Sequence, residues 1–280
     1  MTELTFLKAI NHRIFISLLT IIFYFSISNA QSPYKSSWPK DGYIFGSGIV
    51  VGLIGLGLTK SISPLTVEEI NNLSRDDVNV FDRPATYNYS VDARHLSDVV
   101  VVVCSALPAT LLLSEKVRKD FGVFTVMYLQ TLMFANVLPT FGKGRVVRTR
   151  PFVYNPDAPL EKKLEADARL SWYSGHTTNA FAGAVLFSTL YSNYFPKSKW
   201  KPFVWGGSLI LASFVGYLRV EAGKHFPTDV LFGAAVGSAI GYVIPLLHRR
   251  KDDFDLSISA GSSRNNFEFG FNFKLYFNRN

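Results

Sequence analysis

The sequence predicts an all-α fold: a polytopic membrane bundle of five or six apolar helices, followed by a short C-terminal β-hairpin. Hydrophobic residues make up 48% of its 280 residues. A helix needs about 20 apolar residues to cross a bilayer. Stretches close to this length, most of them uncharged, occupy residues 43–59, 99–113, 121–141, 178–195, 203–218 and 230–247. Near the C-terminus the pattern changes to strict alternation, which is typical of a strand.

Residues 1–30 are predicted to be a signal peptide. Lys8 and Arg13 precede the apolar run 14–27, and the small residues Ser28 and Ala30 stand where a signal peptidase cuts. A run of this length suits the core of a signal peptide better than a membrane span. An uncleaved anchor is the alternative.

Residues 31–97 contain the first apolar stretch and then a polar connector, 60–97, that leans acidic. Stretch 43–59 is rich in glycine and therefore a weak helix former. We expect it to lie along the bundle or dip into it without crossing, which leaves five spans. Pairing with an uncleaved signal segment as a helical hairpin is the alternative.

Residues 98–250 are predicted to form the catalytic helix bundle. Gly233, Gly237 and Gly241 recur every fourth residue and predict a face that packs closely against another helix. A soluble all-α protein with large buried helices is the alternative. Several stretches are apolar around their whole circumference, however, whereas a soluble surface helix carries a polar stripe. The tail, 251–280, alternates from Phe267 to Phe277 and predicts the hairpin.

Composition excludes several classes of function. The net charge of +8 is spread over short basic clusters between apolar stretches, which is typical of a membrane protein and not of a nucleic-acid binder. The single cysteine, Cys104, allows no intrachain disulfide. No Cys/His pair stands at ligand spacing, so we expect neither a metal nor a cofactor.

Three polar clusters stand at the ends of apolar stretches: 143–151, 173–177 and 219–229. In a bundle whose helices alternate in direction, the end of one helix and the start of the next lie on the same side. The first cluster follows the third stretch, the second precedes the fourth, and the last joins the fifth to the sixth. The sequence therefore predicts that all three converge on one face.

The residue types in these clusters suit a compact oxyanion, most plausibly phosphate. Three cations, Lys143, Arg150 and Arg219, can contact phosphate oxygens. Ser174 is a good N-cap, and Gly175 lets backbone N–H groups at a helix N-terminus approach an anion.

Two histidines complete the predicted site. His225, oriented by Asp229, is the candidate nucleophile, and His176 is the candidate general acid for the leaving oxygen. Each cluster alone has an ordinary interpretation, as a membrane-flanking loop, a helix start or a structural His/Asp pair. Their combination on one face favours a catalytic site.

The pattern resembles the type 2 phosphatidic acid phosphatase superfamily, which also includes bacterial acid phosphatases and vanadium haloperoxidases. The signature of that family is matched in spacing by Lys143 with Arg150-Pro151, by Ser174-Gly175-His176, and by Arg219 with His225 and Asp229. The resemblance covers about residues 98–247. It implies a phosphate cradle of Lys143, Arg150, Ser174, Gly175 and Arg219, a nucleophilic His225 supported by Asp229, His176 as acid, and no metal.

Two positions depart from the signature. Tyr173 stands where the family often has Pro, and Leu218 where it often has Ser. The second change puts one polar contact in doubt, but not the mechanism.

We therefore expect a membrane phosphatase that hydrolyses lipid phosphate monoesters or diphosphates through a phosphohistidine. Phosphatidate, phosphatidylglycerophosphate, isoprenyl diphosphate and a lipid A-type glycolipid are candidate substrates. The alternatives are a secreted soluble acid phosphatase, a vanadium haloperoxidase and a non-catalytic membrane protein. The sequence does not specify an oligomeric state.

Basic loops predict the orientation. "EKVRKD", "KSKWK" and "HRRK" all lie at the end of the bundle opposite the three clusters. Cytoplasmic loops collect Lys and Arg. We expect a bacterial inner-membrane protein whose active site faces the periplasm.

Overall fold

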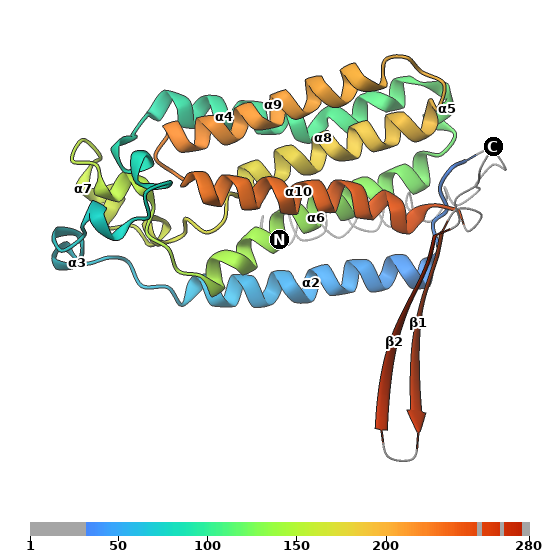
Figure 1. The fold of residues 1–280 in the computed structure, drawn as a ribbon, viewed down its shortest axis with the longest axis horizontal. Helices are drawn as coiled ribbons and strands as arrows, with labels where there is room; N and C mark the ends of the chain where they lie inside the picture. Colours follow the sequence, from blue (N-terminus) through green and yellow to red (C-terminus); the bar gives the residue numbers. More distant parts are fainter. Residues whose placement is uncertain (1–31, 251–253, 264–265, 276–280) are drawn as a thin grey trace, which may run out of the picture.

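Six long helices lie side by side and alternate in direction in the computed structural model (Figure 1). The structure describes residues 32–250 in full and, of the tail, the backbone of 254–263 and 266–275. The predicted signal peptide lies outside the described residues. The long helices are α2 (Trp38–Lys60), α4 (Val91–Ala106), α6 (Phe121–Arg145), α8 (Gly175–Tyr194), α9 (Lys201–Glu221) and α10 (Pro227–His248).

Short elements join these helices. Those between α2 and α4 and between α6 and α8 gather at one end of the bundle, at the left of Figure 1. They are α3 (Val67–Asn71), η1 (Arg75–Asp77) and η2 (Arg83–Tyr87), then η4 (Pro151–Tyr154), α7 (Leu160–Lys163) and η5 (Ala166–Arg169). At the opposite end, η3 (Leu107–Leu113) continues α4 and is followed by α5 (Glu115–Arg118).

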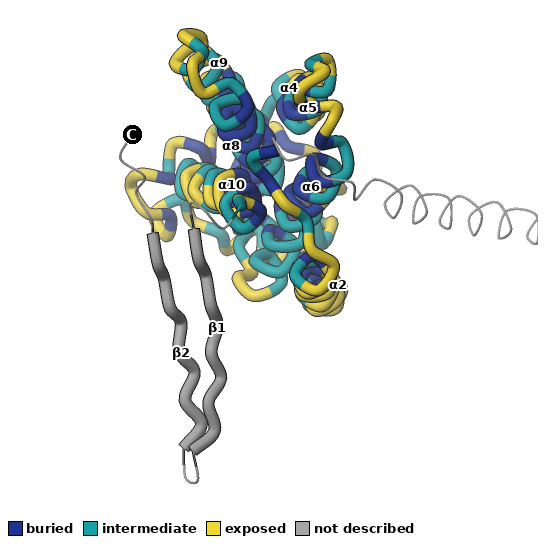
Figure 2. The backbone as a smooth tube through the Cα atoms, turned by 90° about the vertical axis from the view of Figure 1, so that its right-hand side faces the viewer, coloured by how far each residue is buried: buried dark blue, intermediate teal, exposed yellow. Residues whose placement is uncertain are grey.

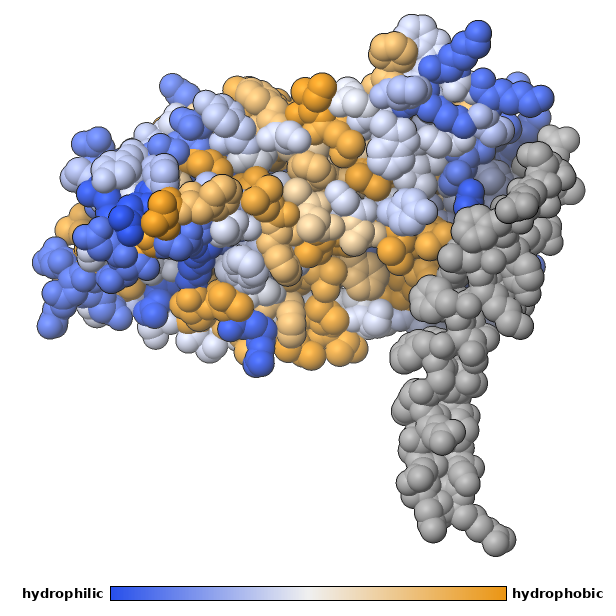
Figure 3. Space-filling view, in the orientation of Figure 1, coloured by the Kyte–Doolittle hydropathy of each residue, from blue (hydrophilic) through white to orange (hydrophobic). Residues whose placement is uncertain are grey.

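Within the described residues, five helices are long and apolar enough to cross a membrane: α2, α4 with η3, α6, α9 and α10. Hydrophobic residues gather over the middle of the face shown in Figure 3, with hydrophilic residues toward both ends. Within residues 32–250 the structure contains no strand. The predicted all-α membrane bundle is therefore confirmed.

Helix α8 is the central helix and is not among these five candidates. More than half of its residues are buried, and Figure 2 shows it surrounded by its neighbours. Its many small residues allow close approach. A Cβ at Gly233 of α10 would lie 2.7 Å from the Ser174 carbonyl oxygen, and Gly237 and Gly241 meet the α8 backbone in the same way. The predicted close-packing face of α10 is confirmed.

Helix α2 is more regular than its glycine content suggests. Its glycines led us to expect a weak helix, yet residues 38–60 form one continuous 23-residue helix. Gly48, Gly52 and Gly55 are its buried face against α6, and a Cβ at Gly55 would lie 2.8 Å from the backbone nitrogen of Phe141. Contact between the two helices outweighs the low intrinsic propensity of glycine. That this stretch lies along the bundle without crossing the membrane stays a prediction.

The start of α2 and the end of α10 both lie at the end of the bundle opposite the polar clusters. A backbone bridge joins Tyr34 to Arg249, and His248 Nε2 lies 2.9 Å from Asp41 Oδ1. The start of α2 is thereby fastened to the end of α10.

Beyond α10 the backbone forms β1 (Phe254–Ser263) and β2 (Asn266–Leu275), antiparallel, with Phe254 opposite Leu275. The side chains of this tail are outside the described part of the chain. The C-terminal hairpin stays a prediction, and the fold class rests on the helices.

Candidate active site

The three polar clusters meet at the end of the bundle under the short elements. Lys143 stands in the last turn of α6, and Arg219 in the last turn of α9. His176 lies in the first turn of α8, and Asp229 in the first turn of α10. The Ser174 backbone N–H donates to the Asp229 carbonyl at 3.2 Å, which joins the starts of α8 and α10 directly.

His225 is buried immediately before α10. Its Nδ1 lies 2.7 Å from the carbonyl oxygen of Ser171. A carbonyl can only accept, so Nδ1 carries the proton and Nε2 keeps a lone pair. Arg150 Nη1 lies 3.3 Å from that Nε2. An oxyanion held by Arg150 would therefore lie beside an unprotonated nitrogen, the arrangement that a histidine nucleophile requires.

Asp229 supports His225 indirectly. Its Oδ2 lies 3.8 Å from His225 Nδ1, beyond a hydrogen bond. The same oxygen accepts from Ser171 Oγ at 2.6 Å and from the Phe226 backbone N–H at 2.9 Å. The carboxylate thus fixes Ser171, whose carbonyl in turn orients the imidazole. Sequence reasoning missed Ser171, because a lone serine in a loop carries no pattern.

His176 is paired with a carboxylate that the sequence did not single out. Its Nε2 lies 2.8 Å from Asp98 Oδ1, and the same oxygen lies 3.6 Å from Arg219 Nη1. Arg219 Nη1 also donates to Ser97 Oγ at 3.0 Å. Arg219 Nε is buried and finds no hydrogen-bond partner among the described residues. A buried donor without a partner is costly, and an anion in the site would satisfy it.

The start of α8 faces the same space. Ser174 caps the helix, and its Oγ accepts from the Thr177 backbone N–H at 3.3 Å. A Cβ on Gly175 would lie 4.0 Å from Lys143 Nζ, so the ammonium group reaches this helix terminus. Backbone N–H groups, the helix dipole and a cation together favour an anion here.

Arg150 is held by Asp167, which belongs to η5. Its Nη2 lies 2.7 Å from Asp167 Oδ1, and its Nε donates to the Asp167 carbonyl at 2.8 Å. Lys224 Nζ lies 3.3 Å from the other carboxylate oxygen. Burial works to raise the pKa of Asp167, but the charges of Arg150 and Lys224 hold it well below its ordinary value. Asp167 therefore stays ionised and fixes the orientation of the planar guanidinium group of Arg150.

Arg148 is the largest omission from the sequence-based site. It pairs with two fully buried carboxylates, Asp82 at 2.7 Å and Asp229 at 2.5 Å. It also donates to Thr228 Oγ1 at 2.9 Å, and its guanidinium lies 4.0 Å from the centre of the Phe226 ring. Asp82 belongs to the connector 60–97, so Arg148 ties that connector to the start of α10. Its place in the first cluster, two residues before Arg150, was the only signal available.

Both histidines of the site are held neutral by their surroundings. Burial, followed by the charges of Arg150 and Arg219, holds the pKa of His225 well below its ordinary value. Burial and the charge of Arg219 lower the pKa of His176 to about 4, although Asp98 opposes the shift. A neutral His225 is ready to act as a nucleophile, whereas His176 must gain a proton before it can act as an acid.

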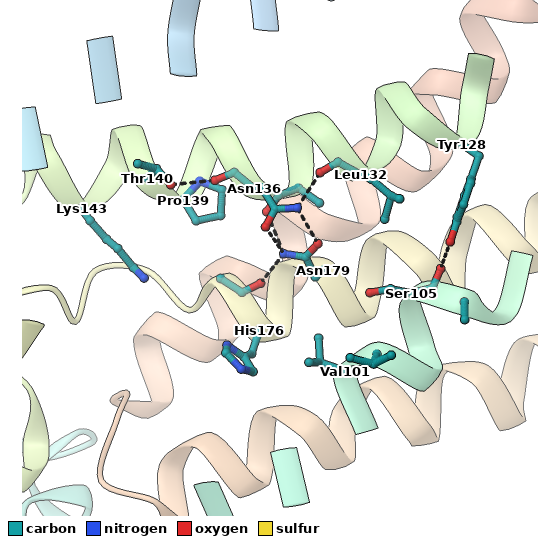
Figure 4. Close-up of a pocket in the computed structure, with 14 residues that line it drawn as sticks. Val101, Ser105, Tyr128, Leu132, Asn136, Pro139, Thr140, Lys143, His176 and Asn179 are labelled. Atoms are coloured by element: carbon teal, nitrogen blue, oxygen red, sulfur yellow. Dashed lines mark hydrogen bonds between the residues drawn. The ribbon is translucent and has the colours of Figure 1, made fainter. Parts of the chain in front are cut away.

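A cavity of about 500 Å³ adjoins the site between α4, α6 and α8 (Figure 4). His176 and Lys143 stand near one end of it, and Tyr128 stands at the other. Its remaining lining residues are Val101, Val102, Ser105, Ala106, Leu132, Ala135, Asn136, Pro139, Thr140, Gly175 and Asn179. The space therefore leads from the polar cluster into the apolar part of the bundle.

Comparison with known proteins points to one family. Residues 124–253 match the model of the PAP2 superfamily. A Lipid A 1-phosphatase of Porphyromonas gingivalis is 39% identical over 77 residues, which are 28% of this chain and 16% of the relative. An Undecaprenyl-diphosphatase of Sulfolobus acidocaldarius is 32% identical over 136 residues, 48% of this chain and 58% of the relative. The chain thus spans less than two thirds of the length of either relative.

Among solved structures, a transmembrane PAP2 type phosphatidylglycerolphosphate phosphatase from Bacillus subtilis aligns with 20% sequence identity and a TM-score of 0.45. The alignment covers 71% of this chain and 94% of that one.

Proposed function

Because this chain belongs to the PAP2 superfamily through residues 124–253, we propose that it is a phosphoric ester hydrolase acting on lipid phosphate monoesters or diphosphates in a membrane. The observation that carries the proposal is the free Nε2 of His225 beside Arg150, 3.3 Å away. The buried, unpartnered Nε of Arg219 and the start of α8 supply further donors for a phosphoryl group.

The proposed reaction has two steps. In the first, the Nε2 lone pair of His225 attacks phosphorus, a P–N bond forms, and the P–O bond to the leaving group breaks. Protonated His176 gives its proton to the leaving oxygen. In the second, neutral His176 takes a proton from a water molecule whose oxygen attacks phosphorus. The P–N bond then breaks, and inorganic phosphate and neutral His225 remain.

The cradle stabilises charge during the transfer. Lys143, Arg150 and Arg219 would face the equatorial oxygens, where negative charge spreads as the phosphoryl group moves. All the groups in this mechanism belong to the chain, and we propose that no metal is required.

The cavity supports a lipid substrate. It joins the polar cluster at Lys143 and His176 and continues between apolar helices. A lipid phosphate could therefore place its head group in the cradle while its hydrocarbon remains among α4 and α6. One relative is named for a lipid A phosphate and the other for undecaprenyl diphosphate, so monoesters and diphosphates are both candidates.

The alternative enzymes share the same cradle. The five apolar helices favour a membrane enzyme over a secreted soluble acid phosphatase. A vanadium haloperoxidase would bind vanadate at His225, and halide oxidation that depends on vanadate would identify it. A non-catalytic membrane protein would keep its function after His225→Ala.

We propose that the site faces the periplasm of a bacterial inner membrane. The opposite end carries the basic segments 115–119 and 197–201, Arg249 and Arg250, and also Lys35 and Lys40 before and within α2. With α2 running the length of the bundle, its start lies at this basic end. A signal peptide cleaved after Ala30 would leave that end outside the cell. Cleavage and a periplasmic site therefore exclude one another.

The direct test uses the full chain purified in detergent, with chelator present. Phosphate release is measured from phosphatidate, phosphatidylglycerophosphate, an isoprenyl diphosphate, a phosphorylated lipid A and a small soluble phosphoester. Release from at least one lipid, lost in His225→Ala, is expected. Absence of release from every compound would refute the proposal.

A further inference from the structure

A pair of asparagine side chains lies in the wall of the cavity, between the site and its far end (Figure 4). Asn136 comes from α6 and Asn179 from α8. Asn136 Nδ2 lies 3.2 Å from Asn179 Oδ1, and Asn179 Nδ2 lies 3.4 Å from Asn136 Oδ1. The mechanism above uses neither residue.

The hydrogen-bond donors of this pair are already used. Asn136 Nδ2 donates to the Leu132 carbonyl at 2.7 Å. Asn179 Nδ2 donates to the carbonyls of Gly175 at 3.0 Å and Ala135 at 3.1 Å. Backbone carbonyls only accept, so these contacts fix which way each amide points. Each Oδ1 keeps a second lone pair that can still accept a hydrogen bond.

The position of Asn136 distinguishes the pair from ordinary helix–helix contacts. A polar residue within a membrane bundle usually faces a neighbouring helix and is buried there. Asn136 is exposed, although it lies well inside the 25-residue helix α6. A polar side chain left exposed at this depth of a membrane bundle is costly, and such residues commonly serve function. We therefore expect the Oδ1 atom of Asn136 to accept a hydrogen bond from a ligand in the cavity.

We propose that Asn136 and Asn179 select lipid phosphates whose linkage near the phosphate carries an N–H or O–H donor, above all an amide-linked acyl chain. The inference rests on the proposed function and names its substrate class. The amide oxygens accept from the lipid's N–H. Ser105, whose hydroxyl makes no hydrogen bond within the described part of the chain, lines the same cavity. Phosphatidate and isoprenyl diphosphates offer no donor there.

The spacing along the helices agrees with this assignment. Asn179 follows His176 by three residues and therefore lies about 5 Å farther along α8. Asn136 precedes Lys143 by seven residues and lies about 10 Å from it along α6. The pair thus meets the part of a lipid that is joined to its phosphate by a few bonds, and not the end of its chain.

The test compares two synthetic lipids that differ in one group: N-acyl-2-aminoethyl phosphate and O-acyl-2-hydroxyethyl phosphate of equal chain length. The wild-type protein in mixed micelles is expected to have a kcat/KM about two- to tenfold higher for the amide, the range of one neutral hydrogen bond. Asn136→Leu should bring the amide-to-ester ratio close to one. Leu132→Val, which alters an apolar residue of the same wall, should leave the ratio as in the wild type.

Each outcome has a separate meaning. Turnover of both lipids by the wild type with a ratio of one overturns the selectivity and leaves the phosphatase assignment standing. No phosphate release from either lipid, or from the panel above, overturns the proposed function and the selectivity with it. If Asn136→Leu does not accumulate, Asn179→Ala provides the same comparison. An amide-to-ester ratio that the variant keeps at the wild-type value overturns the assignment to this pair.

Discussion

His225 is oriented by the Ser171 carbonyl oxygen, which lies 2.7 Å from its Nδ1, whereas the Asp229 carboxylate lies 3.8 Å away. Asp229, which the sequence places beside the proposed nucleophile, thus acts through a neighbour. A backbone carbonyl fixes the tautomer as firmly as a carboxylate would, but it adds no negative charge. This fits a site in which the phosphoryl group brings the charge.

His225→Ala should abolish turnover, because no other group is placed to form the phosphoenzyme. A residual rate above about a hundredth of the wild-type rate would contradict the assignment, since general acid–base catalysis alone contributes roughly 10²–10⁴-fold. Rapid acid quench with labelled substrate should trap phosphate on His225. His95→Ala, at an exposed histidine of α4, is the matched control and should keep both activity and labelling.

Arg150→Lys and Arg219→Lys should each lower kcat/KM by about 10²–10³-fold, the usual cost of losing one donor to transition-state charge. Lysine keeps the charge but not the fork, and at Arg150 it also loses the contacts with Asp167. Arg145→Lys, at an exposed arginine in the last turn of α6, controls for basic charge near the membrane. Near-normal kinetics of both site variants would mean that these arginines only flank the membrane.

Arg148→Met should destabilise the protein by about 3–5 kcal/mol, because it leaves the buried carboxylates of Asp82 and Asp229 without their cation. Thermal unfolding in detergent measures the loss. Arg83→Met is the matched control, because its partner Asp76 is exposed and such pairs contribute about 0–1 kcal/mol. Equal losses of stability in the two variants would mean that Arg148 contributes no more than an exposed ion pair does.

The pH dependence of kcat/KM should show an acid limb far below the ordinary histidine range. Catalysis needs neutral His225, and its depressed pKa in the free protein keeps it neutral until the pH falls well below 6.5. His176 must be protonated, and with a pKa of about 4 the free protein carries less of that form as the pH rises. We therefore expect kcat/KM to fall as the pH rises above about 4, once the titration of the substrate itself is subtracted.

Asp98→Asn supplies the check on that assignment. Asp98 raises the pKa of His176, so its neutralisation should move the falling limb to lower pH. If the fall of kcat/KM stays at the same pH in this variant, His176 is not the general acid.

Cysteine labelling in intact cells should show the site end outside. In a Cys104→Ser background, Glu161→Cys should react with an impermeant thiol reagent, and Lys199→Cys should react only after lysis. Both positions are exposed, at opposite ends of the bundle. The reverse pattern would place the site in the cytoplasm and would agree with a cleaved signal peptide.

The sequence predicted those parts of the molecule that depend on period and order. Apolar stretches marked the helices, and the alternating direction of those helices placed Lys143, Ser174 and Arg219 at one end of the bundle. Glycine content understated the regularity of α2, because glycine propensity is a local property whereas the contact of Gly55 with α6 joins residues far apart in the chain.

The aspartates that hold the site residues in place could not be predicted from the sequence, for a similar reason. Asp82, Asp98 and Asp167 each contact a site residue distant in sequence. A single aspartate in a polar loop or at a helix start looks the same whether it faces solvent or an arginine. Only the folded chain distinguishes these cases.

The contact between α8 and α10 also bears on how such a protein could acquire a new substrate. Gly233, Gly237 and Gly241 bring the two backbones so close that neither helix can turn without a clash. The first turns of these two helices, which carry Gly175, His176 and Asp229, are therefore held in a fixed frame. Divergence toward another lipid, in nature or by directed evolution, would act on the cavity walls that α4 and α6 contribute. Those walls can vary residue by residue while the chemistry stays unchanged.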